Sequence, residues 1–534
     1  MITSELRDHL GFRRMECGMR LLATEADIVN SLDPAVPNSG VLLGLLAQWV
    51  DAGYESPELI QRLLARFPSE CRPALHLLDY LHVRVAEGLV AMAREEFDGA
   101  IAHFLFVQSL RLDADDSELL AICNFWTARC LRHAGRYEDA LGYVVEARRL
   151  ALSCGYEPMA AIMQALESWL AFQRGKLNEA QRLLQGAEEA LGGTDDYVTR
   201  GNIQSAYGRI ARRQGRFADA LDSFNRAIAE YECRDPHHLH KARSLINIAV
   251  VERLIALRQQ KDHDRASARR RADAAGSEMP PLLPGRSNVH ELRASARAHL
   301  SDALTIYQRH GQIRGTGKVH INAGLLALDD GDLEGAAEEA GKGFQQAKEH
   351  EDRILLARVR LLQCSIEHAR LEEEIGDDLA QHARLAADFA REAVEYAAQT
   401  QNPRLLARAY VWQGLSFTLE PIVDLDAANR CCQQALSLLP DVLEREAGWD
   451  DLECLRSRAS LVRPIDPLLR AWSNGAVENR TFQEMTEEFA RIVIPRVWER
   501  EDRKVARVAR KLSISPKKVR RILITAGIHD RHDD

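Results

Sequence analysis

Small and large apolar residues recur along the chain with a period of forty residues. The small residues of four successive segments are Ala100, Ala140, Ala180 and Ala220, and the larger residues four positions further on are Phe104, Val144, Leu184 and Phe224. Residues four apart share one face of an α-helix, and a small residue there lets a second helix approach closely. Gly135, Gly175 and Gly215 precede three of these alanines, where glycine can end the preceding helix. The pattern predicts stacked pairs of α-helices joined by tight turns.

Weaker copies of this pattern extend the predicted array to residues 41–440. The copies are marked by Trp412, Leu415, Ala428, Ala435 and Pro440, by Ala336, by Ala303, and by residues 383–393. Residues 258–290 interrupt the array, because they contain three consecutive arginines and three prolines and lack helical periodicity. We predict a disordered loop there, with repeats at 41–257 and 291–440. Whether the arginine triplet contacts nucleic acid or is simply solvated stays open.

The C-terminal residues 481–534 carry a different helical pattern. Thr481 with Glu484 forms a capping pattern that begins a first helix. Two short helices are then predicted from apolar residues at helical spacing: Val505, Val508, Ala509 and Leu512 in one, and Val519, Ile522 and Leu523 in the next. Ser515 is a favourable N-cap for the last helix, Pro516 suits its first position and Gly527 its end. This arrangement predicts a helix-turn-helix. A connecting segment, residues 441–480, separates it from the repeats, and residues 1–40 are unassigned.

Charge is distributed unevenly along the chain. The whole chain carries −9, whereas the stretch from Arg503 to Arg521 contributes +9 and contains no acidic residue, so the remainder carries −18. A concentrated basic stretch on an otherwise acidic protein indicates an anionic partner, and nucleic acid is the usual one. A solvated helix face is the alternative interpretation of such a charge run. The helix-turn-helix spacing favours nucleic acid.

The second helix of a helix-turn-helix enters the major groove of duplex DNA, and its N-terminal residues approach the bases. The residues at that position in this chain are Ser515, Lys517, Lys518, Arg520 and Arg521. Phosphate contacts are expected from Arg503, Lys504 and Arg507. A single short domain of this kind binds DNA weakly, so we expect a dimer or a higher assembly.

Both patterns resemble known families. The forty-residue repeats over 41–440 resemble the tetratricopeptide repeat (TPR), in the long-helix variant of bacterial signal-sensing regulators. Residues 489–528 resemble the C-terminal helix-turn-helix of Fis-type bacterial transcription regulators, although Glu501, Asp502, Ser513 and Pro516 depart from that family's usual residues. The resemblance implies an all-α fold, a TPR-like α-solenoid superhelix followed by a small helix-turn-helix domain. It also implies binding of DNA as a homodimer.

A TPR superhelix offers a concave groove lined by the first helix of each repeat, and a protein or peptide partner is the expected ligand. Asn247 and Asn322 lie in similar strings of two such helices and could bond the backbone of an extended peptide. The alternative is that each Asn bonds to its own neighbourhood. The aromatic residues of these helices are expected to be packing residues.

The candidate motifs for catalysis or metal binding are incomplete. Gly315-Thr316-Gly317-Lys318 lacks the leading Gly and the final Ser or Thr of a phosphate loop, and His290-Glu291 lacks the second His of a zinc-protease helix. His237, His238 and His240 lack a supporting Cys or carboxylate pattern. The ten cysteines form no Cys-x-x-Cys pair, and the longest apolar run, residues 41–50, is too short to span a bilayer.

We therefore expect a cytoplasmic transcriptional regulator that is no enzyme and uses no cofactor, metal or membrane. Two rival hypotheses remain. One is a non-catalytic TPR scaffold whose basic C-terminal helices dock an acidic protein or RNA. The other is an enzyme accessory or toxin-like effector whose catalytic residues would lie within residues 1–40; no motif supports it.

Overall fold

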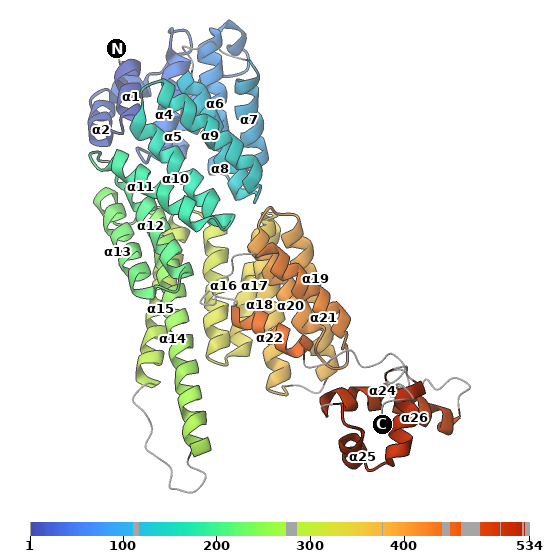
Figure 1. The fold of residues 1–534 in the computed structure, drawn as a ribbon. Helices are drawn as coiled ribbons and strands as arrows, with labels where there is room; N and C mark the ends of the chain where they lie inside the picture. Colours follow the sequence, from blue (N-terminus) through green and yellow to red (C-terminus); the bar gives the residue numbers. More distant parts are fainter. Residues whose placement is uncertain are drawn as a thin grey trace. The chain divides into compact units, whose positions relative to one another are not determined.

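The chain folds into two compact units, residues 1–456 and residues 457–534. The structure is a computed structural model. It describes residues 2–110, 117–273, 286–375, 378–439, 449–460, 481–501, 503–525 and 528. Within these residues the long elements are all α-helices (Figure 1). No helix of this described part combines the length and the apolar character needed to cross a membrane.

The first unit consists of helices arranged mainly as antiparallel pairs. The N-terminal helices are α1 (Ile2–Gly11), α2 (Met15–Thr24), α3 (Ala26–Asn30), α4 (Ser39–Asp51), α5 (Pro57–Leu64), the 3₁₀ turn η1 (Arg72–Ala74), α6 (Leu77–Ala93) and α7 (Phe97–Ser109). The regular pairs follow as α8 (Ser117–His133) with α9 (Tyr137–Ser153), α10 (Glu157–Gln173) with α11 (Leu177–Leu191), α12 (Tyr197–Arg213) with α13 (Phe217–Arg234), and α14 (Leu239–Asp273) with α15 (Arg286–Arg309). The last are α16 (Ile313–Asp329) with α17 (Leu333–Glu349), α18 (Arg353–Glu372) with α19 (Leu379–Ala398), α20 (Pro403–Ser416) with α21 (Leu425–Leu438), and α22 (Trp449–Ser460).

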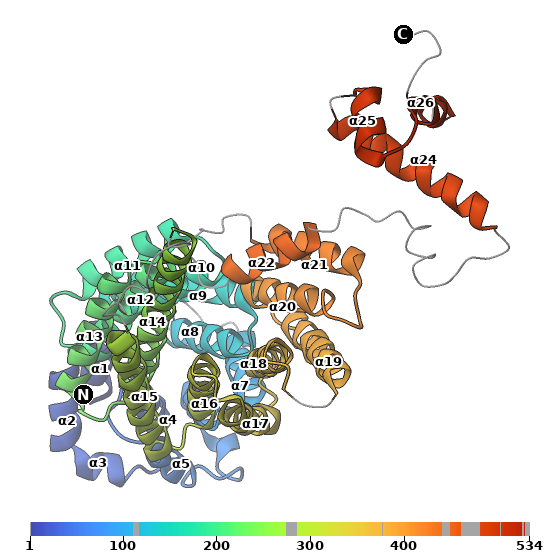
Figure 2. The ribbon, with the colours of Figure 1, turned by 90° about the horizontal axis from the view of Figure 1, so that it is seen from below.

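Successive pairs stack so that the first helix of each pair touches the first helix of the next. Figure 2 shows α8, α14, α16 and α18 near the middle of the unit, with α13, α15, α17 and α19 around them. We call α8, α10, α12, α14, α16, α18 and α20 the inner helices. The alanines and larger residues of the forty-residue pattern are completely buried, and the three turn glycines have positive φ of 72–91°. The predicted helix pairs and glycine turns are therefore confirmed.

Close contact between the helices of a pair depends on residue size. A Cβ atom added at Gly208 of α12 would lie 2.7 Å from the ring of Phe224 on α13, and one at Gly88 of α6 would lie 2.3 Å from Phe104 on α7. Both phenylalanines are fully buried. The missing side chain on the first helix of each pair is what admits the large ring from the second helix.

The N-terminal helices are tied to the middle of the array. The Arg13 guanidinium donates to the carboxylate of Asp196 at 2.8 Å, and Asp196 is almost completely buried. The neighbouring Asp195 accepts from the backbone N–H groups of Met15 and Glu16 at 2.6 and 2.7 Å, which caps the start of α2. The segment 1–40 was unassigned from sequence; its described residues, 2–40, are mainly helical, and the start of α2 is docked at the start of α12.

The loop predicted at residues 258–290 included residues that are helical in the structure. Helix α14 continues through residue 273 and α15 begins at residue 286, while residues 274–285 lie outside the described part. Residues 258–273 are rich in Arg, Ala, Gln, Asp and Lys and contain no Gly or Pro. Most of these are good helix formers, so a helix can extend here without an apolar stripe.

Two turns distant in sequence meet inside the first unit. The backbone N–H of Gln401, between α19 and α20, donates to the carbonyl of Gly135, between α8 and α9, at 2.8 Å. The Gln401 side chain accepts from the N–H of Glu138 at 2.7 Å. Nearby, Arg314 of α16 lies 3.3 Å from Glu95 and covers the Phe97 ring at 4.6 Å. These contacts bring the late inner helices against the early ones and close the array around its inner face.

The second unit contains α24 (Phe482–Arg500), α25 (Val505–Leu512) and α26 (Pro516–Thr525). Its core is formed by Ile494, Val508, Ala509, Val519, Ile522 and Leu523. Thr481 and Glu484 form the predicted capping box at the start of α24. Ser513, in the left-handed conformation with φ of 52°, ends α25. The expected Gly527 stop lies outside the described residues.

Candidate nucleic-acid interface and inner face

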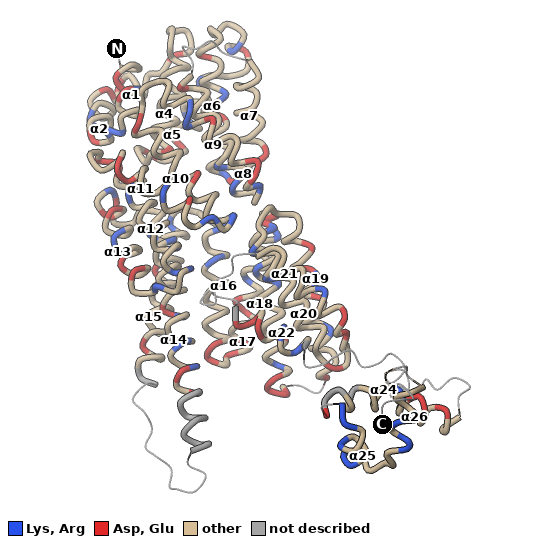
Figure 3. Tube along the Cα trace, viewed as in Figure 1, with Lys and Arg blue, Asp and Glu red and all other residues tan. Residues whose placement is uncertain are grey.

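The side chains of α25 and α26 divide sharply into a buried apolar face and an exposed basic face. Val508, Val519 and Leu523 are completely buried. All the DNA-binding candidates are exposed: Arg503, Lys504, Arg507, Ser515, Lys517, Lys518, Arg520 and Arg521. Figure 3 shows the Lys and Arg positions gathered along these two helices. The fold therefore places the whole basic stretch on the surface of two adjacent helices.

The turn between the two helices follows local chemistry. The N–H of Ile514 donates to the carbonyl of Ala509 at 3.0 Å, which closes the end of α25. The Ser515 hydroxyl then accepts from the N–H of Lys518 at 3.2 Å, as an N-cap does. Pro516 occupies the first helical position, as predicted. The N-terminus of α26 thus presents a positive helix end together with Lys517 and Lys518.

Some of the basic side chains also contact the unit itself. Arg503 lies over the ring of Trp498 at 5.7 Å, Lys511 pairs with Glu501, and Arg521 lies 3.7 Å from Glu487. All of these basic side chains stay largely exposed, so the interactions are weak and can be exchanged for a stronger anionic partner.

The N-terminal half of α24 exposes an apolar stripe. Phe482 is 81% exposed and Phe489, seven residues later, is 49% exposed. Met485 lies between them on the same helical face and is partly exposed. Two exposed phenylalanines one heptad apart on one helix are typical of a surface that another helix covers.

The two candidate groove asparagines have local partners. The Asn247 amide donates to the carbonyl of Arg243 at 2.8 Å, and its oxygen accepts from the guanidinium of Arg212 at 2.9 Å. The Asn322 amide donates to the carbonyl of Lys318 at 2.7 Å. Both residues lie on inner helices, but their amide donors bond to their own helix one turn earlier.

These contacts point to residues that the sequence analysis missed. Seven cationic residues lie on six inner helices and are here named the inner cations: Arg132 on α8, Arg209 and Arg212 on α12, Arg243 on α14, Lys318 on α16, Arg358 on α18 and Arg408 on α20. A signal was available, because Arg129 and Arg132 recur as Arg209 and Arg212 two repeat periods later. Their convergence from helices far apart in the chain could not be read from that spacing.

The inner cations repel one another. Burial, and next the charge of Arg243, lowers the pKa of Lys318 to about 8 and the pKa of Arg132 and of Arg209 to about 9. Burial, and next Arg358, lowers the pKa of Arg212 to about 10. Arg358 on α18 therefore lies close enough to Arg212 on α12 for the two charges to act on each other. The guanidinium groups stay charged at neutral pH.

Acidic groups near this cluster are few. Among the described residues, none of the seven inner cations makes an ion pair with a carboxylate. Asp352 and Glu95 lie near Lys318, and Asp451 lies near Arg408. The buried Nε of Arg209 has no hydrogen-bond partner in the described part of the chain. The inner face is therefore a concentration of positive charge inside a unit that is acidic overall.

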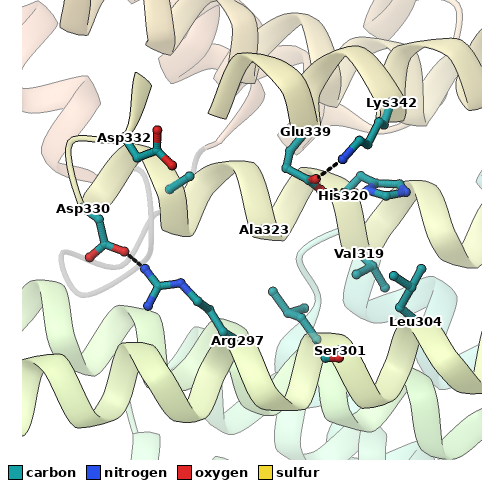
Figure 4. Close-up of a pocket in the computed structure, with 12 residues that line it drawn as sticks. Arg297, Ser301, Leu304, Val319, His320, Ala323, Asp330, Asp332, Glu339 and Lys342 are labelled. Carbon is teal, nitrogen blue, oxygen red and sulfur yellow. Dashed lines mark hydrogen bonds and ion pairs between the residues drawn. The ribbon is translucent and has the colours of Figure 1, made fainter. Parts of the chain in front are cut away.

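A groove between α15, α16 and α17 contrasts with the inner face (Figure 4). Its charged residues neutralise one another: Arg297 pairs with Asp330, and Glu339 accepts from both His320 and Lys342 at 2.8 Å. The remaining charged residue of the lining, Asp332, caps the start of α17, so the groove has no excess positive charge to offer a ligand.

The rejected sequence motifs have structural positions. Gly315 and Gly317 lie within α16, and added Cβ atoms there would lie 2.4 Å from Tyr307 and 2.5 Å from Leu355. These glycines admit neighbouring side chains between helices. His238 and His240 pack on the Tyr231 ring at 5.5 and 5.7 Å. No group of three or more metal-ligating residues gathers within the described residues.

No protein-family model matches the sequence of this chain, and no curated protein matches it. Solved structures do match. A Rap protein complexed with Competence and Sporulation Factor is 12% identical with a TM-score of 0.51, covering 74% of this chain and 98% of that chain. An IFIT1 monomeric mutant with Gppp-AAAA is 14% identical with a TM-score of 0.47, covering 84% and 85%. The quorum sensor NprR from B. thuringiensis, in its apo form, is 14% identical with a TM-score of 0.46, covering 78% and 99%. At such identities the likeness concerns the fold alone, and the chain has a TPR-like α-solenoid fold.

Proposed function

We propose that this chain is a cytoplasmic, non-catalytic transcriptional regulator. Its TPR-like solenoid binds a protein or peptide partner, and α25 with α26 forms a Fis-type helix-turn-helix that binds duplex DNA. The observation that carries the proposal is the exposed basic face of these two helices, with Lys517 and Lys518 at the N-terminus of α26. A major groove admits such a helix, and phosphates surround it.

Two further observations support the arrangement. The apolar stripe of α24, with Phe482 and Phe489 exposed, gives a second copy a surface to cover, and a dimer doubles the DNA contacts. The solenoid carries the acidic excess of the chain, so DNA is repelled from its outer surface and contact is confined to the second unit. The Rap structure, with its bound factor, is consistent with a partner held by a solenoid of this fold.

The test is a titration of duplex DNA with the full chain at several salt concentrations. Log affinity should fall steeply with log salt, with a slope of about 0.9 per phosphate contacted. The double variant Lys517→Ala/Arg521→Ala should bind more weakly and reduce the slope by up to about 2. The matched control is Arg149→Ala/Arg391→Ala, which removes two exposed arginines from α9 and α19 in the solenoid.

Full-length protein that ignores duplex DNA at low salt would overturn the DNA-binding proposal. Equal weakening by the two double variants would show that only net charge matters. The rival scaffold hypothesis gives another pattern. Lys517→Glu/Lys518→Glu would then abolish capture of an acidic protein or RNA partner and leave DNA retention unchanged.

A further inference from the structure

Within the described chain, the inner face of the solenoid gathers more cations than carboxylates, since Asp352, Glu95 and Asp451 are the acidic groups that act on them. Arg132, Arg209 and Arg243 come from three different inner helices and repel one another. Lys318 and Arg358 lie on two further inner helices, and the positive charge of Arg358 also acts on Lys318. Holding like charges together inside a fold destabilises it, so an arrangement of this kind calls for an anionic group that arrives from outside.

Particular contacts hold these side chains in place toward the inner face. Asn247 accepts from Arg212 at 2.9 Å and thereby fixes that guanidinium, and the Arg132 guanidinium lies over the Trp169 ring at 5.2 Å. The Tyr307 hydroxyl lies close to Arg243, whose charge acts on it. Each of these neighbours is neutral. They orient the guanidinium groups while leaving their charge available, which is the arrangement suited to carboxylate or phosphate recognition.

The number of the cations indicates a ligand that carries several negative charges. They lie on six inner helices from α8 to α20, and packed helices are separated by about 8–10 Å. One such step equals about three residues of extended peptide, at about 3.3 Å per residue. Several carboxylates along a peptide can pair with cations from several helices, whereas a single small anion would pair with only some of them.

Aromatic side chains favour a peptide over single-stranded nucleic acid. Recognition of single strands relies on exposed rings on which bases stack. The exposed phenylalanines of the described chain, Phe12, Phe106, Phe482 and Phe489, all lie outside the inner helices. On the inner helices, Trp126 is buried and Trp169 is packed edge-on against Tyr137 at 5.3 Å.

We infer that the inner face binds an acidic peptide segment, with carboxylates along it paired to Arg132, Arg209, Arg243, Lys318 and Arg358. This inference rests on the partner-binding solenoid of the proposed function and is independent of DNA binding. It names the chemistry of the partner, a run of Asp or Glu in an extended segment of another protein.

The experiment uses the full chain and three fluorescein-labelled probes: an octapeptide of Glu, an octapeptide of Gln and a single-stranded (dT)8. Fluorescence anisotropy should report binding of the Glu peptide, weakened by salt, and none of the Gln peptide. Arg209→Gln/Arg243→Gln should weaken binding of the Glu peptide at least tenfold, because two charge-assisted hydrogen bonds are lost. The control Arg149→Gln/Arg391→Gln removes the same charge from the outer helices α9 and α19 and should change affinity less than twofold.

The inner variant should melt at the same or a higher temperature than the unchanged protein, since it relieves repulsion, and this separates lost binding from lost folding. Equal losses in the inner and outer variants would overturn the inference. So would a loss caused by Lys517→Ala/Arg521→Ala instead, or tighter binding of (dT)8 than of the Glu peptide at the inner face. Duplex DNA binding measured on the same preparations shows independently whether the proposed DNA-binding function stands.

Discussion

Size matching between the first and second helices of a pair gives the sharpest test of the repeat packing. In the four segments of the forty-residue pattern, the first helix of the pair carries Gly88, Ala128, Ser168 or Gly208. The second helix carries, sixteen positions later, Phe104, Val144, Leu184 or Phe224. Glycine therefore accompanies each phenylalanine, and Ala or Ser accompanies each smaller residue. A methyl group at Gly208 would lie 2.7–2.9 Å from three atoms of the Phe224 ring, where carbon atoms repel strongly.

The perturbation is a double-mutant cycle at this pair. Gly208→Ala introduces overpacking of about 1–3 kcal/mol, offset by about 1 kcal/mol of improved helix propensity. Phe224→Leu removes ring volume from a fully buried site and should lower the free energy of unfolding by about 1–2 kcal/mol. In the double variant the new methyl occupies space that the ring has left. The two changes should therefore compensate by about 1–2 kcal/mol.

Equilibrium urea unfolding followed by circular dichroism measures these free energies, with an unchanged m-value as the check on the unfolding transition. The control is Gly142→Ala on α9, where an added Cβ meets nothing within 4 Å. It should stabilise by about 0.5–1 kcal/mol and combine additively with Phe224→Leu. Additivity of Gly208→Ala with Phe224→Leu within about 0.5 kcal/mol would refute the size-matching explanation.

Three further predictions concern other parts of the chain. Asp196→Ala leaves Arg13 buried without its partner and should lower the free energy of unfolding by about 3–5 kcal/mol in urea, with faster proteolysis of α1 and α2. Thr481→Ala removes the cap of α24 and should destabilise that helix by about 1 kcal/mol, measured as faster amide exchange in its first turns. Burial and the charge of Arg243 lower the pKa of Lys318 to about 8, so affinity for the Glu peptide should fall as pH rises through 8. The same lowered pKa means that the unfolded chain binds the proton more tightly, so the free energy of unfolding should rise between pH 8 and 10.5, and Lys318→Met should remove both trends.

Much of the fold could be predicted from local sequence patterns. The spacing of the alanines predicted the helix pairs, and Ser515 with Pro516 predicted the start of α26. Both predictions succeeded because they depend on residues within one helix or one turn. The docking of the N-terminal helices could not be predicted, because Asp195 and Asp196, which anchor them, lie about 180 residues away in sequence. Sequence patterns say little about partners at such separations.

The candidate sites show the same division. The exposed basic face of α25 and α26 follows directly from helical spacing and the charge run. The proximity of the inner cations could not be predicted from the sequence. Arg212 and Arg358 come near each other only because the folded array brings α12 and α18 together. Asn247 was picked from its place on an inner helix, and its oxygen bonds to Arg212.

The most direct test of the central claim is amide hydrogen exchange of the full chain with and without duplex DNA. The account predicts new protection confined to α25, the turn at Ser513 and the first turn of α26, with the inner helices of the solenoid unchanged. Unchanged exchange in residues 503–525 under saturating DNA, or protection that appears in the inner helices instead, would contradict it.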